Sequence, residues 1–171
     1  MEFLELAKKR YSVRAYKPDE IEREKLDAVI EAGRVAPTAC NNQPQKIYVV
    51  KSNEIKEKLA SVCRYTFSAP VILVIGYDKE LSWKNKLVEG YESGETDAAI
   101  VTTHMMLEAQ EQGLGTCWVA YFNYGEVEQI LGVPENVRIT AMMPIGYPAD
   151  DAAPSPRHEQ IRDIAETVTE I

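Results

Sequence analysis

Cysteine and histidine are scarce in this sequence. Among 171 residues there are three cysteines, Cys40, Cys63 and Cys117, and two histidines, His104 and His158. No two cysteines stand in a C-x-x-C arrangement and their number is odd, so the sequence offers neither a disulfide framework nor a ligand set for an iron–sulfur cluster. Two histidines are also too few for a multi-histidine metal site. We therefore expect a protein of a reducing compartment that holds no metal.

Long apolar runs and an excess of basic residues are absent as well. The longest apolar run, Ala69–Ile75, is far shorter than the roughly 20 residues of a membrane-spanning helix. The start of the chain carries acids and no basic stretch, unlike a secretory signal peptide, so we expect a cytoplasmic protein with no membrane partner. With 19 Lys and Arg against 27 Asp and Glu, the formal charge is -8. Such a surface repels phosphate backbones, which excludes nucleic acid as an expected partner.

The sequence does contain an irregular alternation of helical and strand patterns, over a length suited to one domain. Apolar spacing predicts helices over residues 2–10, 22–34, 53–62, 95–112 and 124–131. Runs of strand length occur at residues 46–51, 70–77, 116–120 and 138–147. The run at 70–77 is almost wholly apolar, which predicts a central strand buried on both faces. Residues 150–171 have too few apolar positions for a domain of their own, so we expect this tail to pack elsewhere, on a partner chain.

The segment Arg10-Tyr11-Ser12-Val13-Arg14 alternates two arginines with a serine. In an extended chain residues two apart share a face, so both guanidinium groups and the hydroxyl would project on one side. Guanidinium pairs bidentately with phosphate oxygens and keeps its charge, so this pattern indicates a phosphate site. From these residues alone, the alternative is a solvated basic turn.

Residues 36–44 read Ala-Pro-Thr-Ala-Cys-Asn-Asn-Gln-Pro, a dense run of turn-forming and amide residues between a helix and a strand. Amide side chains both donate and accept hydrogen bonds. Asn41 and Gln43 could therefore bind the mixed donor and acceptor edge of a flavin or a nucleobase. The same amides could instead cap helix ends and satisfy the loop backbone.

Two further segments place glycine where the backbone can approach another group closely. Gly113–Trp118 joins a helix to a strand and is not a phosphate-binding P-loop, because no Gly-Lys-Ser/Thr follows. Cys117 in this segment is expected to be a buried thiol rather than a nucleophile. Met143–Pro148 ends the last strand with two prolines around a glycine. A planar ring could lie against this segment, or it could be a plain strand terminus.

Together these four segments resemble the nitroreductase family of FMN-dependent oxidoreductases. The features occur in family order along nearly the whole chain: Arg-x-Ser-x-Arg, Ala-Pro-Thr-x-x-Asn-x-Gln-Pro, a helix led by Asp97 that runs into Gly-Leu-Gly-Thr-Cys-Trp, and Pro-Ile-Gly-Tyr-Pro. The resemblance implies an α+β fold with a central mixed β-sheet flanked by helices. It also implies an intertwined homodimer with two FMN sites at the interface. Residues 1–171 would form one nitroreductase-like domain, with the tail 150–171 exchanged with the partner subunit.

The resemblance also implies roles for individual residues. The phosphate and ribityl chain of FMN are expected to contact Arg10, Ser12 and Arg14, and its ring to lie against Pro144 and Gly146. The partner chain would bring the loop residues Pro37, Thr38, Ala39 and Asn41. From the tail we expect Arg162, in preference to Arg157, to reach the phosphate. No side chain is expected to act as a catalytic acid, base or nucleophile.

The implied activity is hydride transfer from NADH or NADPH to FMN, followed by reduction of a second molecule in the same pocket. The acceptor would be a small nitroaromatic, quinone or similar conjugated electrophile, in a ping-pong cycle. We expect the connection 78–94, with Trp83 and Tyr91, to influence the choice of acceptor. The alternative is a flavin-binding or regulatory protein of the same fold without turnover.

Overall fold

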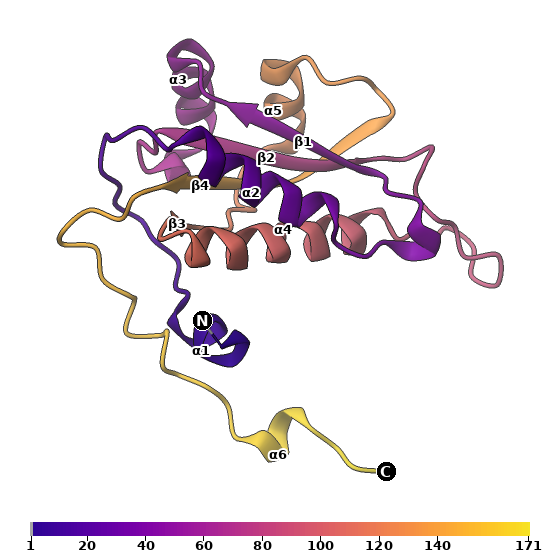
Figure 1. The fold of residues 1–171 in the computed structure, drawn as a ribbon. Helices are drawn as coiled ribbons and strands as arrows, with labels where there is room; N and C mark the ends of the chain where they lie inside the picture. Colours follow the sequence, from indigo (N-terminus) through magenta and orange to yellow (C-terminus); the bar gives the residue numbers. More distant parts are fainter. Residues whose placement is uncertain (1) are drawn as a thin grey trace.

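The computed structural model describes residues 2–171 and contains a β-sheet with helices on both faces (Figure 1). The helices are α1 (Phe3–Lys9), α2 (Arg23–Arg34), α3 (Asn53–Val62), α4 (Gly94–Glu111), α5 (Tyr124–Leu131) and α6 (Ile164–Thr167). The strands are β1 (Gln45–Val50), β2 (Val71–Asp78), β3 (Gly115–Thr116) and β4 (Val137–Gly146). The predicted helices are confirmed, and so are three of the four predicted strands. Within residues 2–171, no helix has the length and apolar character needed to span a membrane.

The four strands form one sheet in the order β1-β2-β4-β3. All three strand pairings are antiparallel, so the prediction of a mixed sheet is wrong for these strands. The chain leaves β1, passes through α3 and a short turn, and enters β2 from the same end of the sheet, which makes the two strands run in opposite directions. Within residues 2–171, parallel pairing is confined to an isolated bridge between Ser12 and Thr116.

Strand β2 is buried along its whole length, as predicted. Ile72 and Val74 pack into one core, which includes residues of α3 and α5. Leu73 and Ile75 pack into a second core with residues of α2 and α4. Because successive side chains point to opposite faces, a strand covered on both sides needs the continuous apolar run that the sequence has here.

The longest helix, α4, packs beside α2 on one face of the sheet (Figure 1). The two helices approach closely at Gly33, where a Cβ atom would lie only 2.8 Å from Cγ of Met105. At about 1.5 Å per residue, the 18 residues of α4 span about 27 Å. The helix therefore keeps the elements at its two ends well apart.

Strand β3 is shorter than predicted. The pattern indicated a strand over residues 116–120, but only Gly115 and Thr116 pair continuously with β4. The next residue, Cys117, donates its amide to the carbonyl oxygen of Pro144 at 3.3 Å. Proline has no amide hydrogen to donate in return, so the ladder ends there and resumes only at the single bridge between Val119 and Met142.

The first part of the tail runs beside the N-terminal segment. The Ala149 amide donates to the Ala15 carbonyl at 3.0 Å, and the Tyr11 hydroxyl donates to the Ala152 carbonyl at 3.3 Å. After residue 158 the chain leaves the body of the molecule, and α6 stands apart from it (Figure 1). All of residues 159–171 are exposed, including the apolar side chains Ile161, Ile164, Val168 and Ile171. A single chain thus leaves the apolar side of its tail uncovered.

Candidate functional site

The predicted phosphate-binding segment leaves α1 in an extended conformation and runs along β3. Ser12 forms a parallel bridge with Thr116, and the Val13 amide donates to the Thr116 carbonyl at 2.9 Å. Val13 is buried against Gly115, where a Cβ atom would lie 2.5 Å from its side chain. Because side chains alternate along an extended chain, Ser12 and Arg14 project away from this core. The extended backbone is therefore consistent with the predicted common face of Arg10, Ser12 and Arg14, on which the prediction of a phosphate site depended.

A partly buried tyrosine joins this segment to the glycine-containing end of β4. The Tyr16 hydroxyl lies 2.9 Å from the Val13 carbonyl and 3.1 Å from the Pro144 carbonyl, so its one hydrogen can be donated to either. Burial raises the pKa of Tyr16 well above its ordinary value, so the hydroxyl stays protonated. A Cβ atom at Gly146 would lie 2.7 Å from Pro70 and 3.2 Å from Tyr16. The first and last of the four predicted segments are thus packed together.

The third segment reaches the same place through Cys117. Burial raises the pKa of the Cys117 thiol, while the charge of Arg14, a hydrogen bond from Ser12 and the charge of Arg10 act in the opposite direction. Arg10, Ser12 and Arg14 belong to the segment that pairs with Thr116, the residue before Cys117, at β3. This small cationic group stands in an otherwise acidic chain, and its guanidinium and hydroxyl donors suit a phosphate monoester.

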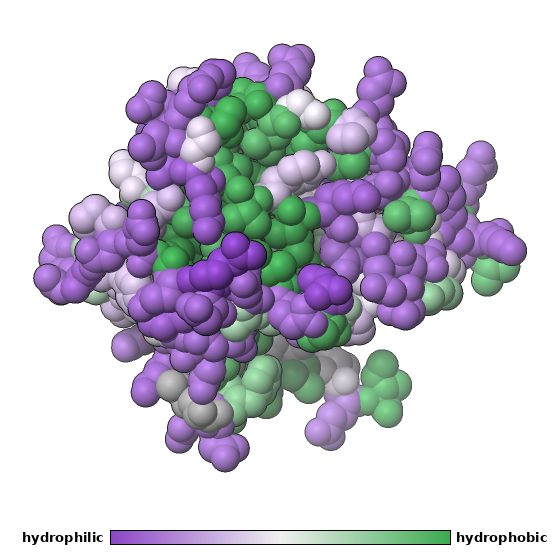
Figure 2. Space-filling model, turned by 45° about the horizontal axis from the view of Figure 1, so that its top comes forward, coloured by the Kyte–Doolittle hydropathy of each residue, from purple (hydrophilic) through white to green (hydrophobic). Residues whose placement is uncertain are grey.

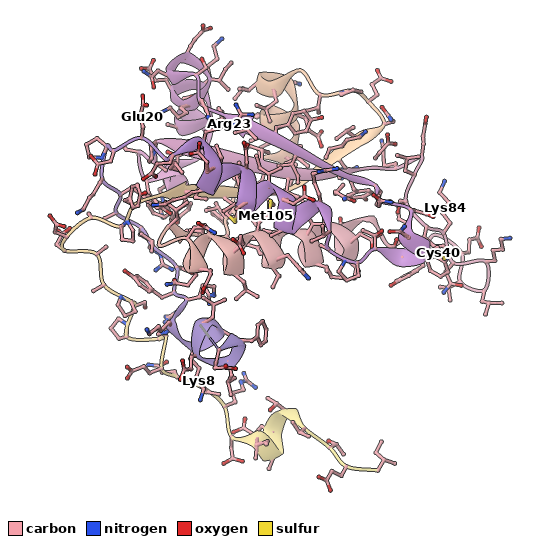
Figure 3. The ribbon with its side chains drawn as sticks, in the orientation of Figure 1. Lys8, Glu20, Arg23, Cys40, Lys84 and Met105 are labelled. Carbon is pink, nitrogen blue, oxygen red and sulfur yellow. The ribbon has the colours of Figure 1, made fainter. Side chains whose placement is uncertain are left out.

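The second segment, residues 36–44, lies elsewhere in the chain. The loop that follows α2 is held at the first turn of α4, where the Ala39 amide donates to Oδ1 of Asp97 at 2.9 Å. The arginine segment instead contacts Thr116, beyond the last turn of α4. Figure 3 shows Cys40 of this loop at one end of α4 and Lys8 of α1 well away from it. One chain therefore does not bring Pro37, Thr38, Ala39 and Asn41 to Arg10, Ser12 and Arg14.

The loop after α2 has an unusual backbone. Cys40, Asn41 and Gln43 all have φ near +50° (52, 54 and 52°), a region that residues other than glycine rarely adopt. Thr38 organises the loop from within, because its Oγ1 accepts the Gln43 amide at 3.0 Å and its carbonyl accepts the Asn41 amide at 3.0 Å. The side chain of Asn41 is exposed. The loop therefore presents its amide groups to the outside of the chain.

The connection 78–94, predicted to influence acceptor choice, lies next to this loop. The Asn42 side-chain amide donates to the Leu81 carbonyl at 3.1 Å, and Figure 3 places Lys84 near Cys40. Trp83 and Tyr91 pack edge to face with centroids 6.5 Å apart. The tip between them exposes Leu87 and Val88. The connection contains turns rather than a helix.

The tail arginines do not reach the cationic group in a single chain. Arg157 and Arg162 are exposed, and the contact of Arg162 is with Glu166, 3.9 Å away in the tail itself. The role predicted for Arg162 therefore depends on where the tail lies in an assembly.

Sequence reasoning missed two residues that organise the site, Tyr16 and Asp97. Tyr16 continues the alternation of Arg10, Ser12 and Arg14 by one more step. The sequence therefore predicts on which face of the extended segment it lies, but not that it bonds to the carbonyls of Val13 and Pro144. In the sequence Asp97 stands out only as the start of a helix pattern. Ser93 and Asp97 are four residues apart, so both lie on one side of the helix start. This spacing is the sequence feature that could have predicted their contact.

The three free cysteines differ in a way that a thiol reagent can measure. Cys40 is exposed, whereas Cys63 and Cys117 are buried and burial raises the pKa of both thiols. Since the thiolate is the reactive form, we expect 5,5'-dithiobis(2-nitrobenzoate) at pH 8 to modify Cys40 fast and the other two only after unfolding. A Cys40→Ser variant should lose the fast phase. A second fast thiol in the folded protein would contradict the placement of Cys117.

Comparison with known proteins shows which sequences and folds this chain is similar to. The sequence profile described as the nitroreductase family matches residues 7–67 and 64–147. A putative NADH dehydrogenase/NAD(P)H nitroreductase of Methanothermobacter thermautotrophicus is 28% identical over 158 residues, which cover 88% of this chain and 80% of that protein. The crystal structure of a nitroreductase family protein from Clostridium difficile superposes with a TM-score of 0.92 at 35% identity, covering 99% and 98% of the two chains. Iodotyrosine deiodinase bound to FMN and 3-iodo-L-tyrosine shares the fold, with a TM-score of 0.78 at 23% identity over 95% and 98%.

Proposed function

Because the chain belongs to the nitroreductase family, we propose that it is an FMN-dependent oxidoreductase that takes hydride from NADH or NADPH and reduces a small conjugated acceptor. One observation carries the proposal. The Tyr16 hydroxyl and the backbone bonds of Thr116 and Cys117 bring the arginine segment, the Gly-Leu-Gly-Thr-Cys-Trp segment and the end of β4 into contact. Arginine charge, a serine hydroxyl and a glycine-containing strand end are thereby placed side by side, as a nucleotide with a phosphate and a planar ring requires.

Each of these residues has a physical role toward FMN. Arg10 and Arg14 would bind the phosphate, since guanidinium remains charged at any physiological pH. Ser12 would donate its hydroxyl to the phosphate or ribityl oxygens. Pro144 and Gly146 would lie against the ring, where a strand end without bulky side chains leaves room for a planar group. We retain Arg162 as a further phosphate contact from the tail.

A second copy of the chain would complete the site. Within one chain the loop after α2 is held at Asp97 and the arginine segment lies beyond Glu111, so about 21 Å of helix α4 separates them. A two-fold symmetric pair could bring the loop of one subunit to the arginines of the other, and would do so twice. Uncovered apolar surface is available for such an interface: a groove of about 530 Å³ includes Phe3, Leu6 and Leu107. We therefore propose a homodimer with two equivalent sites.

Apolar surface also follows the free edge of the sheet. Along β1, a groove of about 410 Å³ is lined by residues including Ile47, Val49, Ile55 and Leu131. Figure 2 shows apolar side chains gathered between polar ones on the side of the molecule turned toward the viewer. Within residues 2–171, β1 has a strand partner only in β2. An unpaired edge beside apolar surface is typical of a strand that another chain covers.

The chemistry divides between cofactor and protein. FMN, when bound, supplies the acceptance and release of hydride. The protein binds and orients the cofactor and the two successive substrates, and excludes water from the ring face. No side chain of this chain is assigned as acid, base or nucleophile in the proposal. Nitroaromatics and quinones are the proposed acceptors, in a ping-pong cycle in which oxidised nicotinamide leaves before the acceptor binds.

Two optical measurements test this function. The purified protein, incubated with FMN and desalted, should retain the visible absorption of a flavin. Under anaerobic stopped flow, NADH or NADPH should bleach that absorption, and a quinone or nitroaromatic should restore it. A preparation that stays colourless after excess FMN would overturn the cofactor assignment. Flavin that stays oxidised at millimolar concentrations of both nicotinamides would overturn the reductase and leave a flavin-binding protein without turnover.

A further inference from the structure

We propose that Asp97 is a positioning residue for FMN binding, and that it acts across the subunit boundary. The proposal rests on the proposed function, because the loop that Asp97 holds is the part of the chain assigned to the FMN site of the partner subunit. We call residues 37–43 the amide loop. Asp97 belongs to α4 and touches no residue of the arginine segment in the same chain.

The Asp97 carboxylate is 2% exposed and is bound on both oxygens. Oδ1 accepts the backbone amide of Ala39 at 2.9 Å, and Oδ2 accepts the hydroxyl of Ser93 at 2.7 Å. No lysine or arginine forms an ion pair with it anywhere in residues 2–171. A buried carboxylate is costly unless it is hydrogen-bonded. The first turn of α4 favours its negative charge, and the two hydrogen bonds hold it in one orientation.

Ser93 shows that this contact is not simply a helix cap. It occupies the N-cap position of α4, where a serine hydroxyl normally accepts an amide from the first turn. Its side chain makes no such capping hydrogen bond, and its backbone is helical, with φ -87° and ψ -8°. The hydroxyl instead donates to Asp97. The cap residue of α4 therefore orients the carboxylate toward a segment that is 58 residues away in the sequence.

The amide loop needs such an anchor. Three of its residues, Cys40, Asn41 and Gln43, have left-handed backbone conformations that cost free energy and persist only where surrounding contacts fix them. The bonds from Thr38 lie within the loop, so they shape it without attaching it to the body. The Asn42 side chain bonds to Leu81 in the neighbouring connection, and Asp97 attaches the loop to a long buried helix at Ala39, between Thr38 and Asn41. Without that acceptor, the Ala39 amide would lose its partner and the loop would sample other conformations.

Four variants separate positioning from general stability. Asp97→Ala removes both hydrogen bonds, and we expect FMN binding to weaken by about ten- to a hundredfold. Asp97→Asn keeps an oxygen for the Ala39 amide and can donate to the Ser93 hydroxyl, so its FMN affinity should stay within about threefold of the wild type. Ser93→Ala should fall between them. The matched control is Thr102→Val, also fully buried on α4, whose hydroxyl bonds only to Ala98 within the helix.

Mixed dimers test the subunit boundary. Two differently tagged chains are coexpressed and purified through both tags, and bound FMN is counted per dimer. Each proposed site takes its arginine segment from one chain and its amide loop from the other. When one chain carries Arg10→Ala and the other Asp97→Ala, both altered elements therefore fall in the same site. The second site is intact, so about one FMN per dimer is expected. When a single chain carries both substitutions beside a wild-type chain, each site has one altered element. Both sites should then bind weakly.

The outcomes are decisive in each direction. The proposal is overturned if Asp97→Ala binds FMN as the wild type does, if Thr102→Val weakens FMN as much as Asp97→Ala does, or if Asp97→Asn fails to restore affinity. It is also overturned if the two kinds of mixed dimer show the reverse pattern. If Asp97→Ala does not fold, Ser93→Ala and faster hydrogen exchange at the Ala39 amide provide the test. Loss of FMN binding by the wild type would instead refute the proposed function itself.

Discussion

Replacing Arg10 with alanine should weaken FMN binding by about ten- to a hundredfold. A hydrogen bond to a charged group contributes about 1.5 to 3 kcal/mol, and about 1.4 kcal/mol corresponds to a tenfold change in affinity. Arg10 is partly buried and belongs to the same segment as Ser12 and Arg14, which runs along β3, so removing it leaves the phosphate with one guanidinium fewer. Quenching of FMN fluorescence during titration of the apoprotein measures the dissociation constant directly.

Two further variants make this measurement specific. Arg23→Ala removes an exposed arginine of α2 that pairs with Asp27, and its FMN affinity should equal that of the wild type. Arg10→Lys keeps the positive charge but loses the bidentate geometry, so its affinity should lie between those of the wild type and Arg10→Ala. Equally tight, stoichiometric FMN in Arg10→Ala would count against the phosphate assignment.

Removing residues 159–171 should convert the proposed dimer to monomer or aggregate. The predicted exchanged tail is residues 150–171, but residues 149–158 pack on their own chain. Only residues 159–171 are wholly exposed, so the deletion is limited to them. Fully burying an aliphatic side chain stabilises by about 1.5 to 3 kcal/mol. With four such side chains per tail, we expect the dimer dissociation constant to rise by at least about a thousandfold, or about 4 kcal/mol. Light scattering at several protein concentrations reports the mass.

Full-length variants show whether the apolar side chains are responsible. Ile164→Asp and Val168→Asp change exposed positions of the tail and should destabilise the dimer in proportion to the area they bury in it. Glu166→Gln, in the same stretch, is the polar control and should leave the mass unchanged. An intact dimer after the truncation would refute exchange of the tail.

Much of the fold could be read from the sequence because its determinants are local. The apolar run of β2 needed only the alternation of side chains to be recognised as a strand covered on both faces. The 18 residues of α4 show apolar positions around more than half of the helix, which indicated burial before any neighbour was known. The spacing of Arg10, Ser12 and Arg14 likewise predicted a common face, and the buried Val13 between them is consistent with it.

Predictions that depended on pairing between distant segments were less successful. The strand expected at 116–120 stops at Thr116 because Pro144, far along the chain, faces Cys117 and lacks an amide hydrogen. The sheet of one chain is antiparallel, since strand direction follows from the path of each connection. The contact of Asp97 could not be predicted from a local pattern either, because its partner Ala39 lies 58 residues earlier.

The sequence alone determined which residues could form helices, strands and a phosphate-binding face, since these properties depend on neighbours within a few positions. Only the tertiary structure decided which of those segments meet. It joined the arginine segment to β4 through the Tyr16 hydroxyl, and it held the amide loop at the far end of α4 through Asp97. The physical reason is that a buried hydrogen bond is fixed by the three-dimensional path of the backbone, which brings together donors and acceptors that no local pattern relates.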